Sequence, residues 1–225
     1  KQIITILFFT LFSMAVAGQN PKAPEQATVV CGNARFTVLT DRLVRMEWSE
    51  DGAFEDRASL AIINRELPVP QYDVRRKDSG VQIRTAALTL EYKGGRFAPE
   101  NLSVLFRMNG RTVTWNPAMK PEGNLKGTVR TLDEIEEGMK EHTAALYMGA
   151  PHVQTRAEME DGLLSRDGWT IVDESGRHLL EKDDSDWGEW IAERPSGDRI
   201  DWYIFAYGHD YTAALSDFTK VAGKI

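Results

Sequence analysis

The stretch LSVLFRMNGRTVTW at positions 102–115 decides the fold class. Two β-prone runs, Leu102–Met108 and Arg111–Trp115, flank the dipeptide Asn109-Gly110. Asn-Gly between two such runs is among the strongest short-range signals for a β-hairpin, because both tip residues must adopt positive φ. The sequence therefore predicts a tight antiparallel hairpin at this point.

Similar segments precede the hairpin. Residues 27–40 predict two strands around a turn at Gly32-Asn33, and residues 85–92 alternate polar with apolar side chains. Residues 43–48 alternate as well, which predicts a strand that is buried on one face only. Pro68 and Pro70 exclude a central strand around them. Short strands with turns at regular spacing predict an all-β antiparallel β-sandwich, although repeated hairpins are equally compatible with a barrel.

Residues 162–175, GLLSRDGWTIVDES, carry a second turn signal. Asp-Gly between an apolar pair and a β-prone run predicts another hairpin, with its tip at residues 165–168. Arg166, Asp167 and Trp169 would then lie together at the end of this hairpin. An arginine, a carboxylate and a tryptophan at a loop tip suit the binding of a sugar, and they are equally common in a purely structural turn.

Two acidic runs, residues 134–142 and 181–190, invite comparison with calcium sites. The first lacks the glycine turn of such loops and the second lacks a bidentate glutamate at the required offset, so both are predicted to be solvated loops. Trp187 and Trp190 in the second run suit either stacking on sugar rings or capping of the core. Residues 144–153 are expected to be irregular.

The C-terminal part combines a strand with a helix. Residues 201–208 form a continuous apolar run that predicts a buried strand, and apolar residues recur at helical spacing over residues 211–222. An amphipathic helix at the end of a β domain indicates a domain boundary.

Composition narrows the possible functions. The chain of 225 residues has a formal net charge of -7, which argues against a general nucleic-acid binder. Its one cysteine, Cys31, excludes an intrachain disulfide and is predicted to be a buried strand residue. The sequence contains neither a nucleophile elbow nor a phosphate-binding glycine loop, and its histidines lack zinc spacing. No catalytic residue, metal ligand or cofactor site is predicted.

The N-terminal segment resembles an export signal. Lys1 precedes a short apolar run, and Ala15 and Ala17 provide an Ala-x-Ala cleavage site. We therefore expect a signal peptide at residues 1–17, a flexible lead-in at residues 18–26, and a soluble mature protein that is periplasmic or secreted.

Four ordered motifs carry a resemblance to a known family. They are NLKGTVRTLD (124–133), GLLSRDGWTIVD (162–173), DWYIFAYG (201–208) and HDYTAALSDFTKVAGKI (209–225). Together they resemble the N-terminal β-sandwich of the family 31 glycoside hydrolases, which has a galactose-mutarotase-like supersandwich fold. The resemblance implies a sandwich domain at residues 27–208 and, at 209–225, a helix that leads to a (β/α)₈ barrel absent from this chain.

In that family the catalytic aspartates lie on the barrel, so the resemblance implies a non-catalytic domain without cofactors. It implies that this domain packs on its own barrel and shapes a carbohydrate pocket, in a parent α-glycosidase or α-glucosyltransferase that acts on α-glycosidic bonds. The substrate-binding candidates at the rim of that pocket are Arg130, Asp133, Arg166, Asp167 and Trp169.

Two other functions remain open. The chain could be a free-standing exported carbohydrate-binding module, which tryptophans around a groove would favour. It could also be a mutarotase-like enzyme, which requires a carboxylate base and a histidine acid that face one sugar.

Overall fold

The computed structural model describes residues 20–127, 139–147, 150–157, 161–182 and 189–223. These residues form antiparallel strands, a short 3₁₀ turn, η1 (Glu25–Ala27), and one α-helix, α1 (Tyr211–Ala222). The strands are β1 (Thr28–Cys31), β2 (Ala34–Val38), β3 (Leu43–Ser49), β4 (Ala58–Ser59), β5 (Asp73–Lys77), β6 (Gly80–Arg84), β7 (Leu88–Tyr92), β8 (Leu102–Met108), β9 (Arg111–Trp115), β10 (Met139–Tyr147), β11 (Ala150–Ala157), β12 (Thr170–Asp173), β13 (Leu179–Lys182), β14 (Glu189–Ala192) and β15 (Arg199–Phe205).

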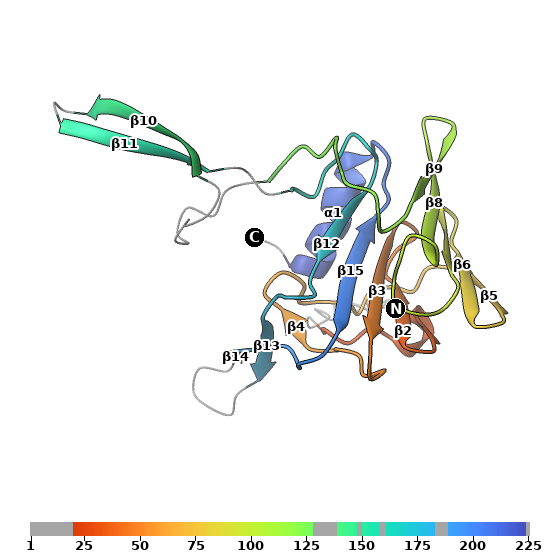
Figure 1. The fold of residues 1–225 in the computed structure, drawn as a ribbon. Helices are drawn as coiled ribbons and strands as arrows, with labels where there is room; N and C mark the ends of the chain where they lie inside the picture. The colour runs from red at the N-terminus through yellow and green to blue at the C-terminus, as the bar shows by residue number, and fades with distance from the viewer. Residues whose placement is uncertain (1–19, 128–138, 148–149, 158–160, 183–188, 224–225) are drawn as a thin grey trace, which may run out of the picture.

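Two five-stranded sheets form the body of the protein (Figure 1). The first has the order β1-β2-β3-β15-β12 and the second has the order β5-β6-β7-β8-β9. Side chains from both sheets belong to one buried cluster, among them Phe36, Met46, Ile204, Ile83, Leu90 and Val104. The predicted all-β sandwich is therefore confirmed, with its main core between the two sheets.

The hairpin that decided the fold class is also confirmed. Strands β8 and β9 pair from Val104 with Trp115 to Met108 with Arg111. Asn109 and Gly110 form the tip with φ values of 52° and 76°, which are the positive angles that a two-residue hairpin turn requires.

The expectation of a half-buried strand at residues 43–48 is wrong, because β3 is buried along its whole length. Its second face lies under a smaller core that contains Ile62 together with Ala214 and Val221 of α1. Helix α1 has the predicted bounds, and the Asp210 side chain caps it by accepting the Ala213 N–H at 3.2 Å. The central strands β3 and β15 of the first sheet therefore have buried residues on both sides.

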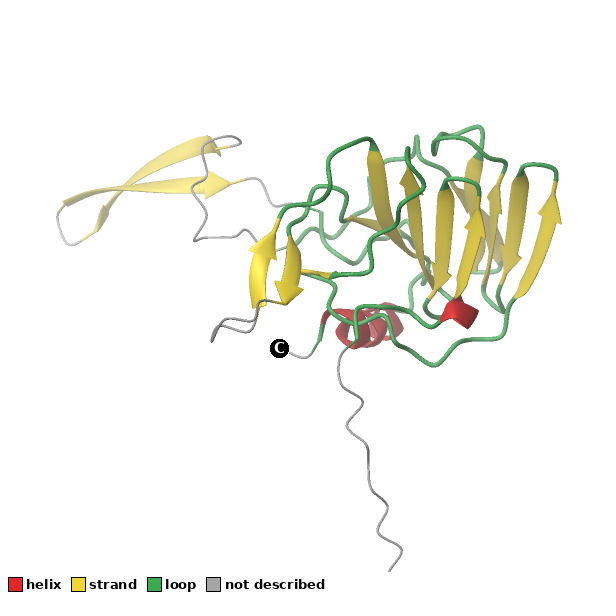
Figure 2. Cartoon of the chain, turned by 90° about the horizontal axis from the view of Figure 1, so that it is seen from below, coloured by secondary structure: helices red, strands yellow, loops and turns green. Residues whose placement is uncertain are grey.

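Residues 144–147 and 150–153 are not irregular, whereas 148–149 lie outside the described residues. The first two ranges fall in a two-stranded hairpin of β10 and β11, whose pairing runs from Met139 with Ala157 to Tyr147 with Ala150. We call residues 139–147 and 150–157 the arm. In both views the arm extends away from the body (Figures 1 and 2), and among the described strands its two strands pair only with each other.

Two smaller observations complete the fold. Cys31 lies on β1 as predicted but is half-buried, and its thiol donates a hydrogen bond to the Ser79 carbonyl at 3.3 Å. The expected signal peptide lies outside the described residues. Within the described part of the chain, no helix has the length and apolar character needed to cross a membrane.

Candidate functional site

The segment predicted as a second hairpin is a turn that joins two distant parts of the chain. The Gly168 N–H donates to the Ser165 carbonyl at 3.2 Å, which closes the turn. Ser165 forms a bridge with Asn124, and β12 pairs with β15 instead of with the residues before the turn. The hairpin prediction for residues 162–175 is therefore wrong, because its first half finds its partner at residues 124–125.

Asp167 forms hydrogen bonds within the protein. Its Oδ2 atom accepts the Gly123 N–H at 2.8 Å and the Ser165 hydroxyl at 3.2 Å. A Cβ atom at Gly123 would lie 2.8 Å from Asp167 Oδ1, so a side chain there would force the carboxylate to shift. The half-buried carboxylate therefore fixes the turn against Gly123.

Arg166 occupies the same turn with an exposed side chain. Its backbone N–H donates to the Gly123 carbonyl at 2.8 Å. Its own carbonyl accepts a hydrogen bond from His209 Nε2 at 2.9 Å. The backbone of Arg166 thus holds two segments together while its guanidinium faces solvent.

The joined segments continue beyond the turn and form the base of the arm. The amide side chain of Asn124 donates to the Gly162 carbonyl at 2.9 Å and accepts the Gly162 N–H at 2.8 Å. Lys126 Nζ lies 2.6 Å from a carboxylate oxygen of Asp161. We call the joined residues 123–126 and 161–167 the neck. The neck brings together the two ends of the segment that contains the arm.

The other predicted site residues are placed differently. Trp169 is 3% exposed and belongs to the main core, where its ring centroid lies 6.1 Å from that of Trp115. It does not present a ring face to solvent in this structure. Arg130, Asp133 and Trp187 lie outside the described residues, as does the side chain of Trp190.

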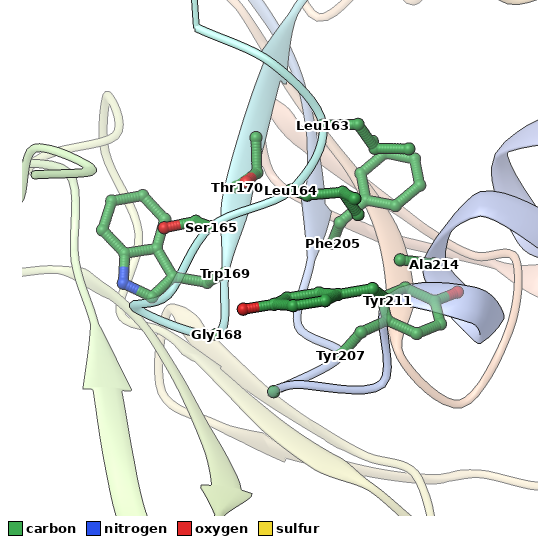
Figure 3. A pocket seen from close by; sticks show the side chains of 11 residues that line it. Leu163, Leu164, Ser165, Gly168, Trp169, Thr170, Phe205, Tyr207, Tyr211 and Ala214 are labelled. Atoms are coloured by element: carbon green, nitrogen blue, oxygen red, sulfur yellow. The ribbon is translucent and has the colours of Figure 1, made fainter. Parts of the chain in front are cut away.

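The space beside the turn is nearly filled. Leu164, Thr170, Phe205, Tyr207 and Tyr211 are among the residues around it (Figure 3). They leave a cavity of only about 10 Å³, which is room for about one water molecule and not for a sugar. The Thr170 hydroxyl is buried in this wall without a hydrogen-bond partner. A water in this cavity would be in reach of such a group.

A wider hollow of about 480 Å³ lies on the other side of Gly208. Its polar side chains come from three separate segments. They are Arg42, Arg107, Asn109, His209 and Asp210. We call this space the polar hollow. None of these residues is a site candidate from the sequence. The Asn-Gly tip and Gly208, the glycine after β15, both lie beside the hollow.

Charged side chains are also buried beneath the segment that follows β3. Arg45 forms a two-pronged ion pair with Asp201, with both nitrogen–oxygen distances at 2.8 Å, and Arg194 approaches the same carboxylate at 2.9 Å. Burial opposes ionisation of Asp201, but Arg45 and Arg194 outweigh it and lower the pKa of Asp201 to about 2. This arrangement stabilises charges inside the fold.

Glu174 lies near this cluster, and its pKa is shifted upward whereas that of Asp201 is shifted downward. Burial raises the pKa of its carboxyl, and the nearby charge of Asp201 adds to the effect, while a hydrogen bond from Ser59 opposes it. Its Oε2 atom is buried without a partner. Within the described residues no group of three histidine, cysteine, aspartate or glutamate side chains is arranged to hold a metal ion.

Comparisons with known proteins complete this description. No family model and no curated protein matches the chain. A search of solved structures finds a GH31 dextranase from Flavobacterium johnsoniae complexed with glucose, with a TM-score of 0.43, 14% identity, and coverage of 86% of this chain and 26% of that chain. It also finds a GH31 α-xylosidase from Xanthomonas citri, with a TM-score of 0.30, 15% identity, and coverage of 70% and 16%. The chain therefore spans about a quarter or less of these proteins.

Proposed function

We propose that this chain is the N-terminal, non-catalytic β-sandwich of an exported family 31 α-glycosidase. In this proposal it packs on a catalytic (β/α)₈ barrel and shapes the carbohydrate pocket of that barrel. The parent enzyme would act on α-glycosidic bonds with retention of configuration. Four ordered sequence motifs on an all-β sandwich support the assignment.

The observation that carries the proposal is the neck. Two of the four motifs, those that begin at Asn124 and Gly162, are hydrogen-bonded to each other although they are 38 residues apart. They fix the base of an arm that has no second layer in the described structure. A two-stranded hairpin is at best marginally stable by itself in water. We infer that the arm lies against a second domain in the complete protein.

An apolar surface on the sheet of β14, β13 and β4 also supports packing against a second domain. In the sheet of β14, β13 and β4, Leu180 pairs with Ala58 on one side and with Ile191 on the other, so the three share one face. Ile191 is 53% exposed, and Leu60, which follows β4, is 52% exposed. Exposed apolar patches mark surfaces that meet a partner.

Helix α1 ends beside this surface. The Val221 carbonyl accepts the N–H groups of Ile63 and Asn64, at 2.9 Å and 3.0 Å. A domain that followed the helix would therefore emerge a few residues from Leu60. We propose that this face packs on the barrel.

The alternatives receive less support. Of the three tryptophans that would suit a carbohydrate-binding module, Trp169 is 3% exposed and forms no platform for stacking on a sugar. Trp187 and the side chain of Trp190 lie outside the described residues. In the polar hollow, His209 Nε2 donates to a carbonyl and Asp210 is paired with Arg42. Mutarotation needs a histidine acid and a carboxylate base that both face the sugar, and these two side chains are instead bonded to other groups of the protein.

The test is the reading frame that follows the codon of Ile225. The proposal expects that frame to continue into a barrel with two catalytic aspartates. A stop codon directly after Ile225 in the native gene would contradict it and would favour the free-standing carbohydrate-binding module.

A further inference from the structure

The polar hollow has the construction of a small-molecule binding site that the proposed function does not use. Its volume of about 480 Å³ lies in the range of small-molecule sites, which is a few hundred to about a thousand Å³. Its lining contains the apolar Met108 and Ala206 and the buried Tyr207 together with the polar side chains.

Hydrogen bonds hold the walls in place before any ligand arrives. His209 Nε2 must be the donor to the Arg166 carbonyl, because a carbonyl oxygen only accepts. In neutral His209 the other ring nitrogen is then an acceptor, and the Asn109 amide lies 3.5 Å from it. The Gly208 N–H donates to the Gly168 carbonyl at 2.9 Å. The hairpin tip, the turn and the start of α1 are thus joined around the hollow, which lowers the ordering cost of binding.

The charges of the hollow indicate the class of ligand. Arg42 is neutralised by Asp210, whose carboxylate lies 2.9 Å from its Nη1 atom. Arg107 has no carboxylate partner among the described residues, and its guanidinium bonds only the Gly110 carbonyl, at 3.2 Å. The hollow therefore carries one uncompensated positive charge in a protein whose net charge is -7. A guanidinium without a carboxylate partner pairs best with the oxyanion of a ligand.

The neighbours of Arg107 add a second requirement. Asn109, whose amide lies 3.5 Å from His209 Nδ1, and Asp210, whose carboxylate is held by Arg42 and the Ala213 N–H, also line the hollow. An amide has a second N–H and a carboxylate has further acceptor sites, so both can still bind a polar ligand. Hydroxyl groups satisfy a donor and an acceptor at once. We propose that the polar hollow binds a sugar acid of monosaccharide size, with its carboxylate on Arg107 and its hydroxyls toward Asn109 and Asp210.

The test is titration of the full chain with D-glucuronate. Binding is measured by calorimetry and by the NMR chemical shifts of the backbone amides. We expect saturable binding with shifts at Asn109 and His209, and weaker binding as the salt concentration rises. Arg107→Ala should weaken binding about tenfold or more, because the carboxylate of the ligand loses its charged hydrogen-bond donor. Arg75→Ala removes an exposed arginine from β5, outside the hollow, and should leave binding unchanged.

Two comparison ligands make the result decisive. D-Glucose should bind at least about tenfold more weakly than D-glucuronate, because it lacks the carboxylate. Inorganic phosphate should also bind more weakly, because it lacks the hydroxyls on a sugar ring. Equal affinity for glucuronate and glucose, equal affinity for glucuronate and phosphate, or an Arg107→Ala variant that binds like the original chain would each overturn the proposal. Because Arg107 is exposed, its variant should fold, and circular dichroism checks this. The outcome is independent of whether a barrel follows Ile225.

Discussion

The N–H of Gly123 donates a 2.8 Å hydrogen bond to the carboxylate of Asp167, across the neck of the arm. This contact changes the role of a residue that the sequence associated with sugar binding. Asp167 lies at the predicted turn, but its carboxylate fixes one motif against another. Its influence on a carbohydrate pocket would then be indirect, through the position of the arm.

Replacement of Asp167 by alanine should lower the free energy of unfolding by about 1–2 kcal/mol, because the Gly123 N–H loses its acceptor in a half-buried place. Urea unfolding measures this. Asp161→Ala is the matched control, since it removes an exposed carboxylate from the same neck and should have a smaller effect. Sugar binding by the chain alone should be unchanged, whereas the parent enzyme should lose activity. Glycan affinity of the chain that disappears in Asp167→Ala would contradict this view.

Gly168 should tolerate no side chain. It has a φ of +79°, and a Cβ atom would lie 2.4 Å from Met108 Sδ and 3.0 Å from Gly208 Cα. Gly168→Ala should therefore destabilise the protein by roughly 2–4 kcal/mol. Gly110 has a similar φ of +76° but open space around it, so Gly110→Ala should cost only about 1–2 kcal/mol. Equal losses in thermal and urea unfolding would show that the close approach to Met108 contributes nothing.

The buried pair of Arg45 and Asp201 should be sensitive to loss of one partner. Arg45 is 1% exposed and Asp201 is 3% exposed. Asp201→Asn should lower the free energy of unfolding by about 3–5 kcal/mol, because it removes the carboxylate that pairs with Arg194 and leaves Arg45 with Glu47 alone. The double variant Arg45→Met, Asp201→Asn should regain part of this loss. If that variant is no more stable than Asp201→Asn, the charge explanation fails.

The two buried carboxylates should affect stability in opposite directions as pH changes. The pKa of Asp201 is lowered from 3.8 to about 2, so its contribution is present above its unfolded pKa and disappears as pH falls through about 2. The pKa of Glu174 is raised from 4.5, so its contribution is present below that value and disappears as pH rises through the folded pKa.

Glu174→Gln isolates the second effect. The variant should gain stability relative to the original chain between pH 4 and pH 7, because it carries no buried charge. Urea unfolding at the two pH values measures the difference. Glu100→Gln, at an exposed position, should show no such change. A difference for Glu174→Gln that is constant with pH would mean that this carboxyl titrates alike in the folded and unfolded states.

Local signals explain the parts of the fold that the sequence predicted correctly. The Asn109-Gly110 tip and the apolar spacing of α1 each lie within one segment, so the pattern alone determines the element. The pairing of Asn124 with Ser165 is different, because its partners are separated by the segment that contains the arm. The Asp-Gly signal marked the turn correctly, but it could not indicate which strand would be the neighbour.

The alternating pattern of β3 also could not predict that its charged side chains are buried. Alternation in β3 placed Arg45 and Glu47 on a polar face, and polar faces are normally solvated. Arg45 pairs with Glu47 and with Asp201 of β15, and Arg194 pairs with Asp201 as well. Asp201 and Arg194 come from another part of the chain, so the pattern of β3 alone could not show these pairs. The role of His209 was missed for the same reason, since its partners Arg166 and Asn109 lie on two other loops.

We propose that this sandwich is one domain of a larger α-glycosidase. This is tested by purifying the native polypeptide with an antibody against this chain, measuring its intact mass, and assaying it with aryl α-glucosides and α-xylosides. We expect a polypeptide much larger than 25.3 kDa that hydrolyses an α-glycoside with retention of configuration. A native polypeptide of about the mass of this chain without such activity would overturn the proposal.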